Sequence, residues 1–347
     1  MLSRIAEALF WIGRYTERAE ATARILDVHV HRVLEDPWLD SASACRSLLS
    51  VMGVPAPAAE SVAATPDGPD GSGGPDGSGG PEAARRGAGG GGMDAARVTE
   101  LLGYDGRNPS SIVGAISAAR ENARGARDVV SSEMWECLNA TWNELGHYEE
   151  LARRLGPHVF FRYIRERTAM FAGLVDATLA RDDGWRFLVV GRTLERVDMT
   201  ARLLSASIGD DPLSQSWVSL LRSCGAHEAY IRTYRRVVDA SRVAEFLLLD
   251  RLFPRSAYWA LSTAEDSLEA LDGARTRTRS TVDDQARRIV GRARNELEFR
   301  SVDELVDDMP DILASLQRTC SAASRAVTER YFAREAPPSW AIEVLAS

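Results

Sequence analysis

Apolar residues recur every three or four positions along most of this chain. The first 35 residues show the pattern clearly, with Ile5, Leu9, Ile12 and Leu26 at helical spacing. Such spacing places apolar side chains on one face of an α-helix. Similar patterns predict helices over residues 109–128, 132–154, 158–181, 185–208, 215–249, 255–272, 281–299 and 303–334. Alternating strand patterns are almost absent, so the sequence predicts an all-α protein.

Residues 53–92 break this pattern. Glycine, proline, serine and aspartate dominate the segment, and no apolar residue recurs in it at a regular spacing. A segment of this composition buries too little apolar surface to offset the entropy that is lost on ordering. We therefore predict a disordered loop at about 53–92.

Two pairs of segments resemble each other within the chain. Residues 12–26 align with 190–204 at an offset of 178 residues, and residues 98–112 align with 243–257 at an offset of 145. The two offsets differ by 33 residues. These extra residues lie in the first copy between the two matches, where the Gly/Pro-rich segment also lies. Because the insertion accounts for the change in offset, the two matches together support one internal duplication.

The duplication predicts the domain organisation. The first helical repeat covers residues 1–184, and the second covers residues 185–347. Each repeat has about five helices. Duplicated helical units commonly pack about a pseudo-two-fold axis. We therefore expect an internally duplicated helical bundle whose halves are fused into one body.

Two polar segments are typical of helix starts. Asn108 or Ser110, beside a proline, is predicted to cap the helix that follows. Ser131 and its neighbours predict another start by the same reasoning.

A stripe of charged residues flanks the apolar face of the first helix and recurs in the second copy. Four positions spaced by four, three and four residues share one helix face, and two arginine positions form a row beside them. In the first copy these positions hold Gly13, Glu17, Glu20 and Arg24, with Arg14 and Arg18 beside them. In the second copy they hold Gly191, Glu195, Asp198 and Arg202, with Arg192 and Arg196 beside them. The similarity between the copies therefore lies mainly in charge rather than in apolar core.

The two glycines of the stripe carry a prediction of their own. A glycine in the middle of a helix costs about 0.5–1 kcal/mol relative to alanine. Gly13 and Gly191 therefore indicate that another helix or a ligand approaches the backbone closely at these positions.

Three hypotheses account for the stripe. In the first, Glu17 and Glu195 form buried structural ion pairs with arginines across the contact between the halves. In the second, the arginines bind a carboxylate or phosphate of a substrate, and the glutamates orient them. In the third, Glu17 and Glu20 join Glu195 and Asp198 as oxygen ligands of Mg²⁺ or Mn²⁺. Because the Glu-x-x-His pair of di-iron bundles is missing, we expect no metal cofactor and keep Mg²⁺ as the weaker alternative.

A second group of arginines differs between the copies. Arg120, Arg124 and Arg127 lie on one helix face, and at the offset of 145 residues their counterparts are all acidic. The counterparts are Glu265, Glu269 and Asp272. A solvated helix face explains the arginines, and an anion-binding site present only in the first copy is the alternative.

Composition narrows the chemistry. All 42 basic residues are arginine, because the chain has no lysine. A P-loop contacts phosphate through a lysine, and Schiff-base enzymes need a lysine amine. Protein kinases and ATP-grasp ligases also place a lysine on the nucleotide phosphates. The composition therefore argues against ATP use by any of these routes. We recognise no other catalytic motif in the sequence, so the catalytic residues stay unknown.

Charge and hydropathy predict the setting of the protein. The net charge is −8, whereas nucleic-acid binders need a basic surface, so we expect no nucleic-acid partner. No apolar run is long enough to span a membrane, and Arg4 and Glu7 interrupt the N-terminal apolar stretch as no signal peptide would allow. The four cysteines are scattered, without C-x-x-C spacing, so neither a disulfide framework nor a zinc site is expected. We predict a cytoplasmic protein and leave open whether it forms a homo-oligomer.

Five segments together resemble a known family. They read LSRIAEALFWIGRYTERAEATARIL at the N-terminus, then NPSSI, ARENAR, SSEMWECLN and FLVVGRTLERVDMTARLL. With these segments the sequence resembles the bacterial Alpha-E family, an all-helical domain named for its Glu-Arg motif. The resemblance covers nearly the whole chain and places the motif at Glu17-Arg18 and Glu195-Arg196. The Gly/Pro-rich segment departs from the family pattern.

The resemblance implies partners rather than an activity. Genes of this family accompany a circularly permuted ATP-grasp ligase, often together with a transglutaminase-like peptidase. The resemblance therefore implies an auxiliary helical component of a peptide ligation or modification system, which binds the ligase and an anionic peptide substrate. The alternative is an enzyme that acts on the ligase product through the Glu/Arg stripe, with Mg²⁺ as a helper.

Overall fold

The computed structural model describes residues 3–35, 38, 40–54, 94–209, 217–272 and 285–332. Within these residues the regular structure is helical and no strand is present, which confirms the all-α prediction. The loop predicted at about 53–92 lies almost entirely outside the described residues.

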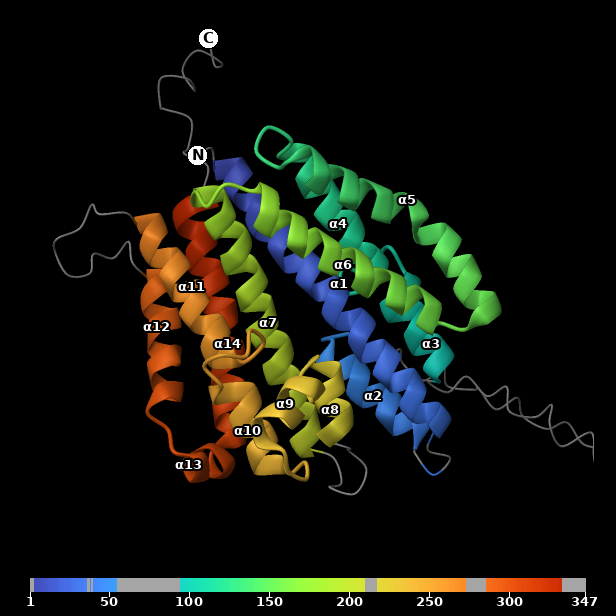
Figure 1. The fold of residues 1–347 in the computed structure, drawn as a ribbon, viewed down its shortest axis with the longest axis vertical. Coiled ribbons are helices and arrows are strands. Elements are labelled where there is room, and N and C mark those ends of the chain that lie inside the picture. Colours follow the sequence, from blue (N-terminus) through green and yellow to red (C-terminus); the bar gives the residue numbers. More distant parts are fainter. Residues whose placement is uncertain are drawn as a thin grey trace, which may run out of the picture.

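Two long helices form the centre of the molecule (Figure 1). They are α1 (Ser3–Glu35) and α7 (Asp183–Gly209), which pack against each other more extensively than any other pair. Both were predicted from their apolar periodicity, and both carry the charged stripe.

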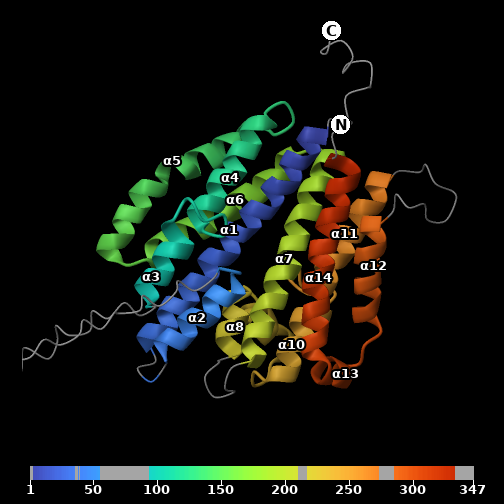
Figure 2. The same cartoon turned by 180° about the vertical axis from the view of Figure 1, so that it is seen from behind.

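Three helices flank each central helix (Figures 1 and 2). On one side, α4 and α6 pack on α1, and α5 packs outside them. These helices are α4 (Ile112–Gly125), α5 (Ser132–Leu155) and α6 (His158–Thr178). On the other side, α11 and α14 pack on α7, and α12 packs outside them. These helices are α11 (Ala257–Asp272), α12 (Gln285–Glu298) and α14 (Met309–Val327).

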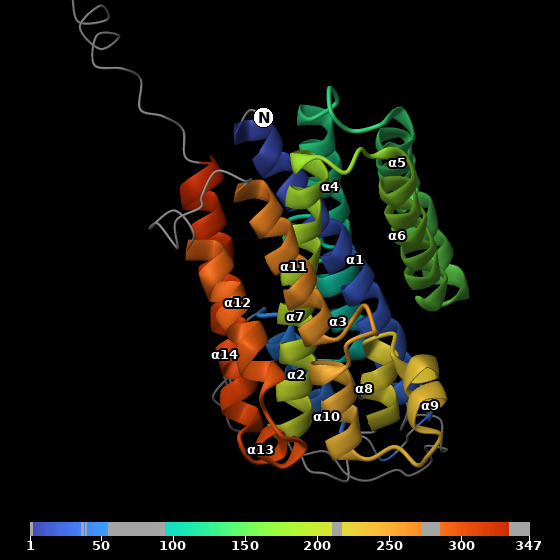
Figure 3. The same ribbon diagram turned by 60° about the vertical axis from the view of Figure 1, so that its left-hand side comes forward.

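Short helices close one end of the bundle (Figure 3). There α2 packs on α7, while α8 packs on α1. The short helices are α2 (Ser41–Val51), α3 (Ala95–Thr99), α8 (Trp217–Ser223), α9 (His227–Tyr234), α10 (Ala240–Leu249) and α13 (Val302–Asp307). Single π-helical turns follow α3 at Glu100–Tyr104 and α14 at Thr328–Phe332.

Two long helices predicted from periodicity are wrong in extent. The segment 215–249 folds as α8, α9 and α10, because Gly225 and Arg235 adopt left-handed backbone conformations with φ of 63° and 48°. The segment 303–334 is likewise divided, since Pro310 lies in the first turn of α14 and cannot continue α13. Apolar spacing continues across such breaks, so periodicity alone does not reveal them.

One of the two predicted helix starts is also corrected. The cap of α4 is Ser111, whose hydroxyl accepts from the backbone N of Gly114 at 2.9 Å, rather than Asn108 or Ser110. The start predicted at Ser131 is confirmed, because its hydroxyl caps α5.

The apolar core extends across the contact between the two sides. One continuous cluster of buried residues includes Phe10 and Ile12 of α1, Leu194 of α7, Leu261 of α11 and Leu313 of α14. A second cluster lies beneath the C-terminal part of α1. All four cysteines are buried and free. None of the described helices combines the length and the apolar character that crossing a membrane requires.

Candidate functional site

The central helices touch through backbone at the two stripe glycines. A Cβ atom added to Gly13 would lie 2.1 Å from the carbonyl oxygen of Leu188, and one added to Gly191 would lie 2.0 Å from that of Phe10. Real Cβ atoms do not approach so closely, so only glycine fits at either position. The predicted close approach is confirmed, and a helix makes it.

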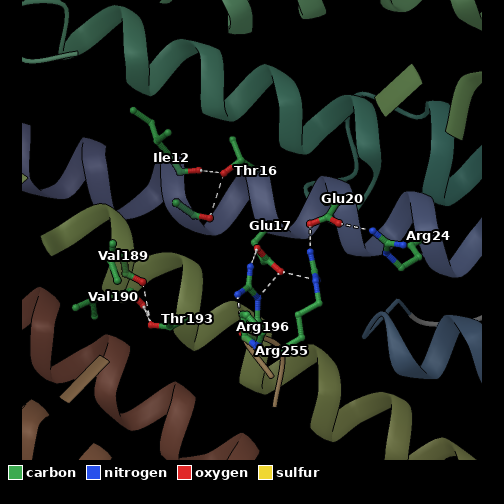
Figure 4. Close-up of polar contacts among 12 residues, drawn as sticks. Ile12, Thr16, Glu17, Glu20, Arg24, Val189, Val190, Thr193, Arg196 and Arg255 are labelled. Atoms are coloured by element: carbon green, nitrogen blue, oxygen red, sulfur yellow. Dashed lines mark hydrogen bonds and ion pairs between the residues drawn. The ribbon is translucent and has the colours of Figure 1, made fainter. Parts of the chain in front are cut away.

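This crossing places Glu17 of α1 against arginines of the other side (Figure 4). Arg196 of α7 donates from Nε to Oε1 at 2.9 Å and from Nη2 to Oε2 at 2.7 Å. Arg255, which lies just before α11, donates from Nη1 to Oε1 at 3.0 Å. Glu17 is only 5% exposed, so these charge-assisted bonds replace the water that burial removes.

Glu20 extends this group by one helical turn (Figure 4). Arg24 of the same helix donates from Nη2 to Oε1 of Glu20 at 2.7 Å, and Arg255 donates to the other carboxylate oxygen. Arg255 therefore bridges Glu17 and Glu20. We call Glu17, Glu20, Arg24, Arg196 and Arg255 the Glu17 cluster.

Glu195 of α7 has the reciprocal arrangement. Arg18 of α1 donates from Nε to Oε1 at 2.6 Å and from Nη2 to Oε2 at 3.1 Å. Arg14 donates from Nε to Oε2 at 2.7 Å and, through Nη1, to the hydroxyl of Ser324 on α14 at 2.7 Å. Glu195 is 1% exposed. Each glutamate of the Glu-Arg motif thus pairs with the motif arginine of the other central helix.

Asp198 and Arg202 extend this second group. Arg202 donates from Nε to Oδ2 of Asp198 at 2.9 Å and from Nη1 to the carbonyl of Val51 at 3.3 Å. This pair repeats the spacing of Glu20 and Arg24. We call Arg14, Arg18, Glu195, Asp198 and Arg202 the Glu195 cluster.

The two clusters differ at one position. Arg14 pairs with Glu195, whereas its counterpart Arg192 makes no matching bond to Glu17, where Arg255 lies instead. The buried Nε of Arg192 has no hydrogen-bond partner among the described residues. Burial and the neighbouring Arg196 lower the pKa of Arg192, which fits a cation whose compensation is incomplete.

The electrostatics follow from these contacts. Burial raises the pKa of Glu17, but Arg196 and Arg255 outweigh it and lower the pKa to about 2. For Glu195, burial is likewise outweighed by its two arginine partners, and the pKa is lowered. Asp198 differs, because burial raises its pKa more than its one arginine partner lowers it. Both motif glutamates are therefore charged at neutral pH and are poor proton donors.

Acid should lower the free energy of unfolding because it protonates Glu17. Its pKa falls from an ordinary value of 4.5 to about 2 on folding, so its contribution is complete above about pH 4.5 and is lost as the pH falls towards 2. The shift corresponds to about 3 kcal/mol. Urea unfolding at pH 6, 4 and 3 should show a smaller acid-induced loss in Glu17→Gln than in the unaltered protein. Equal losses in the two proteins would contradict this assignment.

The contacts favour the structural hypothesis for the stripe over the metal hypothesis. All four stripe carboxylates accept hydrogen bonds from arginine. No group of three or more His, Cys, Asp or Glu side chains suited to a metal ion occurs in the described part of the chain.

The arginines proposed as an anion site in the first copy have other contacts. The Arg120 guanidinium lies 4.3 Å from the ring centroid of Trp142, and Arg127 lies 4.6 Å from that of Trp135. Arg124 is exposed and pairs with Glu121 at 2.8 Å. Arg120 also pairs with Glu121 at 2.7 Å, so that carboxylate already compensates Arg120 and Arg124, while Arg120 and Arg127 cover tryptophan faces.

Sequence reasoning missed Arg255 and Ser324. Arg255 aligns with Ser110 of the first copy, so the repeat gives no signal for it. Its place at the first position of a predicted helix is the one available clue, because a side chain there can reach back to the neighbouring central helix. Ser324 carries no sequence signal, since a small hydroxyl on a helix is common.

Comparison with known proteins finds the Glu-Arg motif in the description of a matching family. The profile of the family described as Alpha-E, a predicted alpha-helical domain with a conserved ER motif, matches residues 1–332. Uncharacterised proteins of Mycobacterium bovis and of Mycobacterium tuberculosis are each 25% identical to the chain over 329 residues, which is 90% of this chain and 35% of theirs. The chain thus spans about a third of the length of the curated relatives it matches. No solved structure matches it significantly.

Proposed function

The chain belongs to the Alpha-E family, and we propose that it is a helical binding module rather than a catalyst. In this proposal it docks on a circularly permuted ATP-grasp ligase and binds an anionic peptide that the ligase uses or modifies. ATP activation then belongs to the partner, in keeping with the absence of lysine from this chain.

The pairing of the motif glutamates carries this proposal. Glu17 and Glu195 are buried, charged and held by two arginines each, so neither is placed to exchange a proton with a substrate. Such a pair fixes how α1 crosses α7. The Glu-Arg motif then serves to hold one rigid arrangement of helices, which is what a docking surface needs.

The length of the relatives supports a partner. In the mycobacterial proteins the segment similar to this chain makes up about 35% of the polypeptide. The same helical unit is therefore joined to other protein in those chains. The proposal accordingly includes a further protein component beside this helical unit.

We also propose that the fold arose by duplication into halves of about 1–184 and 185–347. Two reciprocal pairs of contacts support it, because Glu17–Arg196 and Arg18–Glu195 exchange at an offset of 178 residues, as do the two glycine contacts. The start of α4 also recurs in α11, because Ile112 and Ala257 differ by 145 positions. A pseudo-two-fold axis between α1 and α7 would relate these contacts.

Co-purification tests the docking. Tagged chain and an ATP-grasp ligase encoded in the same genome should elute together by size-exclusion chromatography at micromolar concentration. A P-loop ATPase of similar size from the same genome serves as the control partner. Separate elution of the chain and the ligase, or equal retention of the control, would contradict the proposal.

A further inference from the structure

A cavity of about 320 Å³ lies beside the C-terminal half of α1, and neither motif glutamate lines it, although Arg24 of the Glu17 cluster does. Helices α1, α6 and α8 contribute its four arginines, which are Arg24, Arg32, Arg165 and Arg222. A volume of this size suits a small ligand or the end of a peptide. We call it the arginine cavity.

Two of these arginines are held in place before any ligand binds. Glu20 fixes Arg24, and Arg165 donates from Nη1 to Oδ2 of Asp27 at 3.0 Å. The Arg24 guanidinium also lies against Gly225, where an added Cβ would be 3.1 Å from its Cζ atom and where φ is +63°. The glycine thus makes room for the arginine and keeps it at the cavity wall.

Both held arginines keep an unused donor. The Nε atoms of Arg24 and Arg165 are buried, and neither has a hydrogen-bond partner in the part of the chain that the structure describes. A buried donor without an acceptor costs free energy. Arg222 is exposed at the same cavity, so it is free to turn towards a ligand.

The carboxylates of the cavity limit the charge of the ligand. Asp27, Glu35 and Glu228 also line it, so the positive excess is small. A phosphate dianion carries more charge than this excess can neutralise, whereas a single carboxylate matches it. Arginine also binds a carboxylate through two parallel N–H donors.

A second pocket adjoins the arginine cavity and is less charged. It has a volume of about 300 Å³ and shares Val28, Arg32 and Ser219 with the cavity. Its walls include Ile25, Leu48 and Leu203 of α1, α2 and α7. A ligand with a carboxylate next to an apolar group can therefore occupy both spaces at once.

From these contacts we infer that the arginine cavity binds the free carboxyl terminus of a peptide, with the last side chain in the adjoining pocket. The choice of a peptide rests on the proposed function, while the choice of a carboxylate rests on the cavity. Bound in this way, the peptide would present its preceding residues to the docked partner.

Calorimetric titration with two matched peptides tests the inference. The acetylated tripeptide Ala-Ala-Leu with a free carboxylate should bind at least 10-fold more tightly than its C-terminal amide, because charged hydrogen bonds are lost on amidation. Arg165→Gln and Arg222→Gln should each weaken binding of the acid by about 10-fold. Arg154→Gln, an exposed arginine on α5 outside the cavity, should leave it unchanged.

Several results would overturn the inference. The first is equal affinity for the acid and the amide, and the second is no binding of the acid at millimolar concentration. The third is unchanged binding of the acid in Arg222→Gln. The fourth is displacement of the bound acid by inorganic phosphate at a lower concentration than by acetate. Because Arg222 is exposed, its variant keeps the test valid even if Arg165→Gln fails to fold. A chain that co-purifies with the ligase but binds neither peptide refutes the carboxylate site alone. A chain that binds the acid but not the ligase refutes the docking alone.

Discussion

Glu195→Gln should lower the free energy of unfolding by about 3–5 kcal/mol, measured by urea unfolding at pH 7. Glu195 is 1% exposed and accepts four hydrogen bonds or ion pairs from Arg14 and Arg18. Glutamine keeps the volume but removes the charge, so two guanidinium groups lose their counterion in a dry contact. Uncompensated buried charge is the main source of the loss.

Two further variants decide whether this loss belongs to the buried pair. Glu149→Gln on α5 removes a partly exposed pair with Arg153 and should leave the unfolding midpoint nearly unchanged. The double variant Glu195→Gln with Arg18→Gln should lose less than the sum of the single losses, because removing both charges leaves fewer unpaired groups. If Glu195→Gln kept its stability within about 1 kcal/mol but lost peptide binding, the stripe would be a substrate site instead.

Self-similarity located the glutamates of the two clusters but not the geometry of their pairing. The sequence shows that Glu17 and Glu195 occupy equivalent positions, each followed by an arginine. It does not show that each glutamate reaches the arginine of the other copy. That choice depends on how α1 crosses α7, which the packing of the whole bundle determines.

The sequence does not predict how the Glu17 cluster differs from the Glu195 cluster. Arg14 and Arg192 are equivalent in sequence, yet Arg14 bonds Glu195 and Ser324 whereas Arg192 lacks a matching bond. Arg255 takes that place on Glu17 from outside the repeated motif. A pattern on one helix cannot reveal a partner that another element supplies.

The two stripe glycines are the positions at which the sequence best predicted the packing. A mid-helix glycine is costly by itself, so its presence at both stripe positions indicated a compensating contact. The contact proved to be helix backbone on helix backbone. At Gly225 the helix was predicted from apolar periodicity alone, which continued through a glycine whose backbone conformation ends the helix.

Gly191→Ala should therefore lower the free energy of unfolding by about 3 kcal/mol, at the upper end of the usual cost of overpacking. The new Cβ would lie 2.0 Å from the carbonyl oxygen of Phe10. A flexible side chain in contact with the new Cβ could turn away from it. The carbonyl oxygen of Phe10 cannot, because it belongs to the backbone of a long helix. The central helices must separate, which also lengthens the bonds of Glu17 and Glu195 next to the crossing. Gly13→Ala should have a similar effect, because its Cβ would meet Leu188 at 2.1 Å.

Gly173→Ala on α6 supplies a control of opposite sign. A Cβ there meets nothing within 4 Å, so alanine should raise stability by about 0.5–1 kcal/mol through its better helix propensity. The same urea experiment measures both changes. If Gly191→Ala behaved like Gly173→Ala, the central helices would not be in backbone contact in solution. The central helices would then cross at a larger separation. At that separation Arg18 and Arg196 could not each donate two hydrogen bonds to the glutamate of the other helix.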